Sequence, residues 1–249
     1  MISENMKLAT GLKFTNGYCY IKGSGHRIRL PKLDKNLALI LGILWGDGWL
    51  VSRKVAKRNF SWRIGMVGCD LQLINCYTSL IHKVFSIKPR LHDRKTKVEA
   101  YFNSRVIYEL LNRTYGFPDG EKIGRLKMPQ SVMDSEELIP PFLSGAFSTD
   151  GTFVIDKNYP RIGVNSATLK FIVDIEKSLH KLGFNPRISV WNRKIGNPLY
   201  GVYLNGHRQA NLFYQKIGFI GEKANKLTHF LNYCPASTAP SRDDKSRGI

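Results

Sequence analysis

The chain has 249 residues, with 38 Lys and Arg against 19 Asp and Glu, which gives a formal net charge of +19 at pH 7. A charge excess of this size is more than solubility requires and indicates a polyanionic partner, with nucleic acid as the first candidate. The four cysteines show no paired spacing, so neither a zinc ribbon nor a disulfide framework is supported, and a reducing intracellular compartment is expected. The longest apolar run, 37–46, is well short of the roughly 20 residues that a membrane span needs, so we expect no membrane partner.

The first half of the chain predicts an alternation of helices and strand pairs. Residues 1–33 are a basic N-terminal extension, expected to be an added arm or a short extra strand. An apolar run over 36–46 leads into Asp47 and Gly48 and predicts a helix that ends at a glycine C-cap. The alternating stretch "FSWRIGMV" predicts a half-buried strand, and an amphipathic helix follows with Asp70 as its N-cap. The remaining elements of this half are two strands, 89–95 and 99–103, and a helix, 105–115.

The second half predicts the same order of elements after a linker at 123–138. A helix over 139–149 is followed by the alternating stretch "PRIGVNS" and by an amphipathic helix with Ser166 or Thr168 as its N-cap. Two strands, 186–193 and 199–205, and a helix, 208–217, complete this half. The last residues, 235–249, are polar and contain Pro and Ser, and we expect them to be disordered.

Three stretches occur twice in the same order, which indicates a duplicated domain. They are "LGILWGDG" and "SGAFSTDG", "HKVFSIKPRL" and "HKLGFNPRI", and "YGFPDGEK" and "IGFIGEK". The repeat predicts a first domain at 34–122 and a second at 139–234. The fold class is therefore expected to be α+β, with two pseudo-symmetric αββαββα domains that each contain a four-stranded antiparallel sheet.

Small residues in the two apolar helices predict a close helix contact between the domains. Glycine within a helix costs about 1 kcal/mol relative to alanine, so the pair Gly42 and Gly46 needs a compensating reason. Small residues four positions apart let helix backbones approach, and the second copy has Gly145 and Thr149 at this spacing. If the helices pack about a pseudo-twofold axis, their ends place Asp47 and Asp150 side by side. A divalent cation between the two carboxylates would offset their repulsion.

The stretches "ILGILWGDG" (40–48) and "LSGAFSTDG" (143–151) resemble the two motifs of a single-chain LAGLIDADG homing endonuclease. The αββαββα order, the motif separation and the repeated "GEK" agree with that family over roughly residues 34–232. The first acidic letter of the motif is replaced by Trp45 and Ser148, but the last acid is retained in both copies.

The resemblance implies a metal-dependent phosphodiesterase. Asp47 and Asp150 would be catalytic metal ligands, with Gly46 and Thr149 beside them in the metal site. Mg²⁺ is the expected cofactor; Mn²⁺ is expected to substitute and Ca²⁺ to bind without cleavage. The two sheets would form a saddle in the DNA major groove, on a long target of roughly 20 base pairs. Both strands would be cut to leave short 3′ overhangs, as in intron homing by an intron-encoded, monomeric enzyme.

The outward positions of the predicted strands supply the candidate DNA contacts, because alternate residues of a strand share one face. Arginine suits this role, since its fork reads guanine O6 and N7. The candidates are Trp49, Arg53, Arg63, Arg90, His92, Arg94, Lys97, Thr152, Arg161, Asn165, Arg187, Ser189, Trp191, Arg193 and Tyr203. The family places a basic side chain near each scissile phosphate, and Arg105 and Arg208 are the candidates for that role.

Two other functions use the same fold. An RNA maturase that assists splicing would bind intron RNA without needing both aspartates, and a non-cleaving DNA-binding regulator would be expected to lose one or both. An intein is disfavoured, because no flanking splicing domain is recognisable in the sequence. The compartment stays open between archaeal cytoplasm and an organelle.

Overall fold

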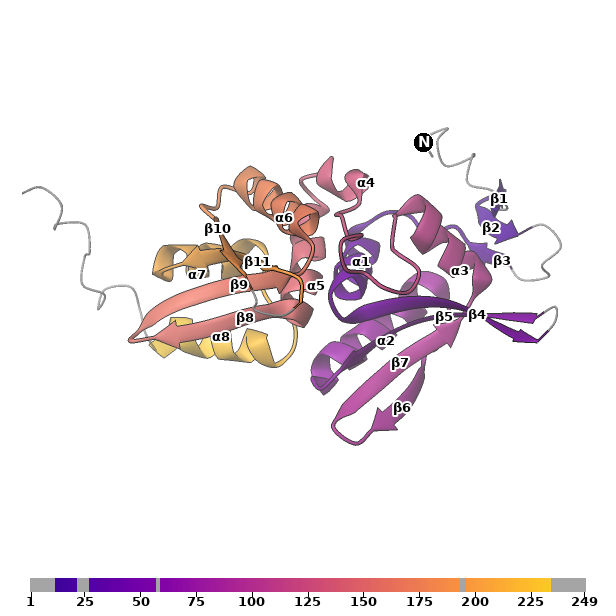
Figure 1. Cartoon of the computed structure of the whole chain (residues 1–249), viewed down its shortest axis with the longest axis horizontal. Coiled ribbons are helices and arrows are strands. Elements are labelled where there is room, and N and C mark those ends of the chain that lie inside the picture. The colour runs from indigo at the N-terminus through magenta and orange to yellow at the C-terminus, as the bar shows by residue number, and fades with distance from the viewer. Residues whose placement is uncertain (1–11, 22–26, 57–58, 193–195, 234–249) are drawn as a thin grey trace, which may run out of the picture.

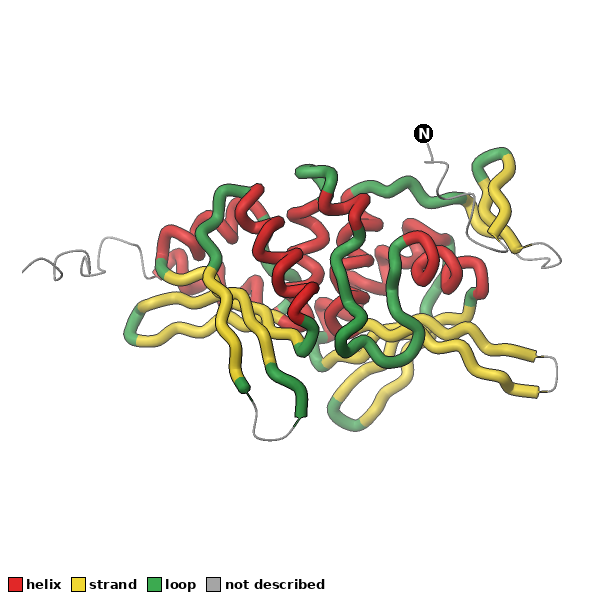
Figure 2. Tube along the Cα trace, turned by 45° about the horizontal axis from the view of Figure 1, so that its top comes forward, coloured by secondary structure: helices red, strands yellow, loops and turns green. Residues whose placement is uncertain are grey.

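The computed structural model describes residues 12–21, 27–56, 59–192 and 196–233 (Figure 1). Two four-stranded antiparallel sheets lie on one side of the molecule, and the helices lie on the other (Figure 2). Helices α1 and α5 stand at the centre, between the two sheets (Figure 1). The predicted α+β class with two αββαββα units is confirmed.

The two units share one topology. The first contains α1 (Lys35–Asp47), β4 (Gly48–Ala56), β5 (Asn59–Gly68), α2 (Leu71–Phe85), β6 (Arg90–Arg94), β7 (Lys97–Asn103) and α3 (Arg105–Glu109), which continues as a π-helical turn (Leu110–Thr114). The second contains α5 (Ile139–Asp150), β8 (Gly151–Asp156), β9 (Tyr159–Ser166), α6 (Leu169–Lys181), β10 (Arg187–Trp191), β11 (Leu199–Asn205) and α7 (His207–Lys216). The strand orders are β4-β5-β7-β6 and β8-β9-β11-β10, so the sheets are equivalent.

The strands show the expected alternation between a core face and an outer face. In β5, Ile64 and Met66 are fully buried, whereas Arg63, next to Ile64, faces the other side and is partly exposed. In β8, Phe153 is buried between the exposed Thr152 and Val154. Period-2 patterning therefore predicted correctly which side chains line the outer faces.

Two predicted helix signals act differently in the structure. Asp70 caps α2 as expected, but the Thr168 hydroxyl, at the N-cap position of α6, makes no capping bond to that helix. Gly48 and Gly151 occupy the C-cap positions of the two motif helices as predicted, but their φ of −79° and −77° makes them extended and not left-handed. The helix passes straight into a strand there, and a Cβ on Gly48 would collide with the Leu44 backbone. Close approach, not a positive φ, accounts for these glycines.

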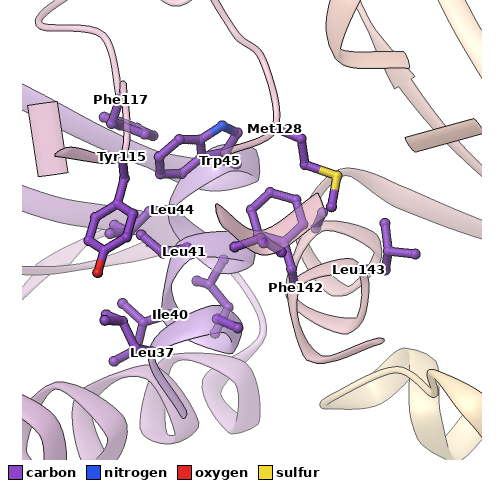
Figure 3. Packing of buried hydrophobic residues seen from close by; sticks show 14 of the residues in the cluster. Leu37, Ile40, Leu41, Leu44, Trp45, Tyr115, Phe117, Met128, Phe142 and Leu143 are labelled. Atoms are coloured by element: carbon purple, nitrogen blue, oxygen red, sulfur yellow. The ribbon is translucent and has the colours of Figure 1, made fainter. Parts of the chain in front are cut away.

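Helices α1 and α5 pack with their backbones in contact. A Cβ on Gly42 would collide with the Phe142 carbonyl oxygen, and one on Gly145 would lie 2.6 Å from both the Ile43 nitrogen and the Leu39 oxygen. Around this contact the core is largely apolar, and Leu41, Trp45 and Phe142 pack where the helices meet (Figure 3).

Elements outside the repeat also pack against the core. Part of the N-terminal extension, which the sequence predicts to be an arm or a short extra strand, forms a three-stranded antiparallel sheet. Its strands are β1 (Leu12–Thr15), β2 (Tyr18–Ile21) and β3 (Arg27–Arg29). The segment 123–138 contains the short helix α4 (Gln130–Met133), and the indole nitrogen of Trp45 donates to the Lys127 carbonyl at 2.7 Å. After α7 the chain adds α8 (Glu222–Tyr233). The tail predicted at 235–249 lies outside the described residues.

The contact between α1 and α5 predicts a steric penalty at Gly42. Helix propensity alone would make Gly42→Ala stabilising by about 1 kcal/mol. Because the new methyl group would meet the Phe142 backbone, we expect the free energy of unfolding to fall instead, by about 1–3 kcal/mol. Gly68→Ala is the control, since its nearest neighbours would be 3.7 Å away or more. Urea unfolding of both variants gives the comparison, and equal stabilities would contradict the packing described.

Candidate active site and nucleic-acid interface

Two carboxylates meet where the central helices end. Helix α1 ends at Asp47 and α5 at Asp150, and each helix leads directly into the first strand of its own domain's sheet. The two ends are close, because a Cβ on Gly46 would collide with the Thr149 side chain and would lie 3.4 Å from the Asp150 Oδ2 atom. The carboxylates therefore lie near the pseudo-twofold axis, between the two sheets.

Two lysines bind the carbonyl groups at these helix ends. The Lys122 ammonium donates to the Gly46 carbonyl and, at 3.3 Å, to the Trp45 carbonyl. The Lys223 ammonium donates to the carbonyls of Ser148 and Thr149, both at 2.7 Å. These carbonyls have no partner within their helices, and the ammonium groups also offset the negative end of each helix dipole. Each motif helix thus carries a cation beside its terminal aspartate.

The charges of the four groups act on one another. The pKa of Asp47 is raised by loss of hydration, which the positive charges of Lys122, Lys223 and Lys97 oppose. The pKa of Asp150 is raised to about 6, first by loss of hydration and then by the Asp47 carboxylate, although part of the Asp150 side chain is open to solvent. Burial lowers the pKa of both lysines, and the two aspartates oppose that change.

The oxygen atoms at this point suit a hard divalent cation. In the described part of the chain, no group of three or more His, Cys, Asp or Glu side chains is placed to hold a metal. Two carboxylates and the main-chain oxygens of Gly46 and Thr149 remain, and both of these oxygens already accept bonds from ammonium cations. Mg²⁺ is commonly held by one or two carboxylates together with water and phosphate oxygens, so this donor set fits it.

Sequence reasoning missed Lys122 and Lys223 as site residues. The repeated "GEK" served only as part of the repeat and of the family resemblance; its second copy lies at the start of α8, at Glu222. The exposed Arg105 lies with its guanidinium 5.2 Å from the Trp62 ring, and Arg208 is exposed in the first turn of α7. Neither arginine is among the groups whose charges act on the two aspartates. The repeat itself was the signal that could have identified the lysines.

The outer face of the first sheet holds several candidate contacts in fixed positions. The Arg63 guanidinium lies 5.3 Å from the Trp49 ring centroid and 4.3 Å from that of Tyr101. Arg94 donates twice to the buried Glu99 carboxylate, at 2.7 and 3.1 Å, and His92 lies 3.6 Å from it. The candidates Arg53, Arg90 and Lys97 are exposed. Glu99, which the sequence analysis did not select, therefore orients part of this surface.

The second sheet presents a related but less charged face. The Tyr203 hydroxyl donates to the Asn165 side-chain oxygen at 2.5 Å, and Arg161 donates to the Asn205 side-chain oxygen at 3.1 Å. The Trp191 ring packs edge-on against Tyr203, with centroids 5.5 Å apart. Thr152 and Arg187 are exposed and Ser189 is partly exposed, while Arg193 lies outside the described residues.

Strand register shows that the two outer faces are equivalent. Tyr101 pairs with Gly65 on one side and Arg90 on the other. Tyr203 pairs in the same way with Gly163 and Arg187. A Gly-Tyr-Arg row therefore crosses each sheet at the same place.

Comparison with known proteins agrees with this fold. The LAGLIDADG-like domain family matches residues 138–218. The homing endonuclease I-DmoI, in complex with DNA and Ca, superposes with a TM-score of 0.58 at 16% identity, covering 79% of this chain and 98% of I-DmoI. The resemblance to the LAGLIDADG family is confirmed. A second LAGLIDADG structure, the meganuclease I-AabMI bound to uncleaved DNA, gives a TM-score of 0.52 at 14% identity, covering 78% of this chain and 88% of that one. At these identities the likeness establishes the fold of this chain.

Curated relatives match most of this chain but only part of their own length. The replicative DNA helicase DnaB of Nostoc sp. is 26% identical over 224 residues, which is 82% of this chain and 25% of the helicase. A DNA polymerase of Thermococcus hydrothermalis is 26% identical over 214 residues, 83% of this chain and 12% of the polymerase. The chain therefore spans a quarter or less of these relatives, whose named activities differ. In the described residues, no helix is both long and apolar enough to cross a membrane.

The raised pKa of Asp150 predicts how Asp150→Asn changes stability with pH. Asp150 binds its proton more tightly in the folded state, where its pKa is about 6, than in the unfolded state, where its pKa has the ordinary value of 3.8. Ionisation of this side chain therefore destabilises the fold as pH rises from about 4 to about 6. Asparagine does not ionise. In metal-free buffer we expect the Tm of Asp150→Asn to rise relative to the natural chain over this interval and the difference to stay constant above it. A Tm difference independent of pH in calorimetry would contradict this.

Proposed function

We propose that this LAGLIDADG protein is a site-specific double-strand DNA endonuclease. The observation that carries the proposal is the placement of Asp47 and Asp150 together between two sheets whose outer faces are rich in arginine. The I-DmoI and I-AabMI structures are complexes with DNA, and that for I-DmoI also includes a divalent metal. The net charge of +19 favours the same partner.

The outer faces support a major-groove interaction. A two-stranded β-ribbon fits the major groove, and an arginine held between aromatic rings, as Arg63 is, loses little side-chain entropy when it contacts a base. Exposed side chains such as Arg53, Arg90 and Arg187 are available for guanine or phosphate. We carry over from the resemblance a target of roughly 20 base pairs, short 3′ overhangs, an intron-encoded origin and a monomeric enzyme.

The chain's own residues divide the work at each scissile phosphate. Asp47 and Asp150, with the Gly46 and Thr149 carbonyls, would hold Mg²⁺, which lowers the pKa of bound water and neutralises charge at the leaving oxygen. Lys122 and Lys223, in place of Arg105 and Arg208, are the basic groups that would contact the scissile phosphates. Their ammonium groups lie at the two helix ends and would stabilise negative charge developing on the phosphate oxygens.

Cleavage of a random-sequence duplex library tests the proposal. In Mg²⁺, with sequencing of the new ends, we expect one enriched motif of roughly 20 base pairs that is cut on both strands. Asp47→Asn and Asp150→Asn should abolish cutting while keeping duplex binding, because neither side chain belongs to the outer faces.

Three other outcomes would contradict the proposal or part of it. Tight, salt-sensitive duplex binding without cutting would identify a DNA-binding regulator. Preference for structured RNA without cutting would identify a maturase. Cutting that persists in both aspartate variants would refute the assigned metal ligands.

The two lysines predict a loss of rate without a loss of affinity. We expect Lys122→Met and Lys223→Met each to lower the single-turnover cleavage rate by about 10²–10³-fold, as removal of one donor to a developing anion does. The duplex affinity should change little. Arg105→Met is the matched control and should keep the rate within about threefold, since Arg105 contacts Trp62. The reverse ranking would restore Arg105 as the positively charged side chain near a scissile phosphate.

A further inference from the structure

One carboxylate joins helices from the two domains. The Asp70 Oδ1 atom accepts from the backbone amides of Gln72 and Leu73, at 2.9 and 3.1 Å, and so caps α2. Its other oxygen, Oδ2, accepts from the backbone amide of Glu222 at 2.7 Å. Glu222 is the first residue of α8, 152 residues away in the sequence. A single side chain therefore binds the amino ends of two helices, one in each domain.

The chain is shaped to reach this carboxylate. Gly221 has φ of +76°, a conformation that glycine adopts without strain. A Cβ at this position would collide with the Asp70 carboxylate. The backbone before α8 is therefore pressed against Asp70, which any other residue at position 221 would prevent.

The residue after this contact is Lys223, whose ammonium group binds the Ser148 and Thr149 carbonyls. The same segment is fixed on its other side, where the Ile220 amide donates to the Ser148 hydroxyl at 2.8 Å. The start of α8 is thus held by α5 and by Asp70 of the first domain. Asn225 of α8 also donates to the Gln72 side-chain oxygen at 3.5 Å, so loosening the Asp70 contact would remove one of several supports of Lys223, and the one with a charged acceptor.

The corresponding contact in the other half is weaker. Thr168, at the N-cap position of α6, accepts from the Gly124 amide at 2.9 Å, two residues after Lys122. The acceptor in this bond is a neutral hydroxyl, whereas Asp70 provides a charged acceptor. Hydrogen bonds to charged acceptors are roughly twice as strong. The two lysines are therefore supported unequally.

We propose that Asp70 is a positioning residue: through its contact across the domain interface, it holds Lys223 in place for DNA cleavage. The proposal rests on the proposed endonuclease function, since Lys223 acts there on the DNA. Asp70 touches neither the carboxylates nor the outer faces of the sheets. Its effect on the reaction passes through Lys223.

A double-mutant cycle distinguishes this role from simple helix capping. Asp70→Asn keeps an oxygen to cap α2, because asparagine is a favoured N-cap, but its amide nitrogen cannot accept from Glu222. We expect Asp70→Asn to slow single-turnover cleavage about tenfold in the natural chain and less than about twofold in the Lys223→Met background. Equal slowing in both backgrounds would show that Asp70 does not act through Lys223 and would overturn the proposal.

Thr168→Val supplies the matched control, because it removes the Gly124 contact without uncapping α6. We expect any slowing of single-turnover cleavage by Thr168→Val to disappear in the Lys122→Met background and to persist in the Lys223→Met background. Cleavage effects of Asp70→Asn that disappear in the Lys122→Met background instead would contradict the assignment of Asp70 to Lys223.

Amide hydrogen exchange tests the contact without any reaction. The Glu222 amide should exchange at least about tenfold faster in Asp70→Asn than in the natural chain, while amides within α2 keep their protection. Unchanged protection of Glu222 would overturn the proposal even if the protein cleaves DNA. If the natural chain cuts no duplex but Glu222 loses protection, the endonuclease function fails while the Asp70 contact stands.

Discussion

Direct contact between the backbones of α1 and α5 is the constraint on which the rest of the structure depends. Gly42 and Gly145 let each helix approach main-chain atoms of the other, and Gly46 lets the two helix ends come together. Because both sheets begin where these helices end, the contact fixes the position of one sheet relative to the other. Any side chain larger than hydrogen at Gly42 would push apart the helices and, with them, the two carboxylates.

Bringing two aspartates to negative helix ends carries an electrostatic cost, and the lysines of the repeated "GEK" offset it. Lys122 and Lys223 neutralise the helix-end carbonyls that would otherwise repel the carboxylates. The substituted motif letters contribute to the same arrangement. The Trp45 indole nitrogen donates to the Lys127 carbonyl, and the Ser148 hydroxyl accepts from the Ile220 amide. Each bond therefore fixes part of the segment that carries Lys122 or Lys223. Departures from the family motif here support the site.

The two sheet faces are alike in register and different in charge. A Gly-Tyr-Arg row crosses each sheet, but Glu99 binds Arg94 on the first face while Gly201 occupies the corresponding position on the second. The glycine leaves room for Tyr203, Asn165 and Trp191 to pack over it. Under the proposed function, this difference would let the two halves of one protein recognise unequal halves of one target.

The sequence by itself determined the duplication, the order of elements, the outward faces of the strands and the pair Asp47 and Asp150. Each of these depends on local periodicity or on a repeated string, which a chain carries without its fold. The sequence did not identify Lys122 and Lys223 as neighbours of the aspartates, nor Asp70 as a link between the domains. These contacts join residues 74 or more positions apart, such as Lys223 to Thr149 and Asp70 to Glu222. Only the packing of α1 on α5 brings such residues together, so the tertiary structure alone decided them.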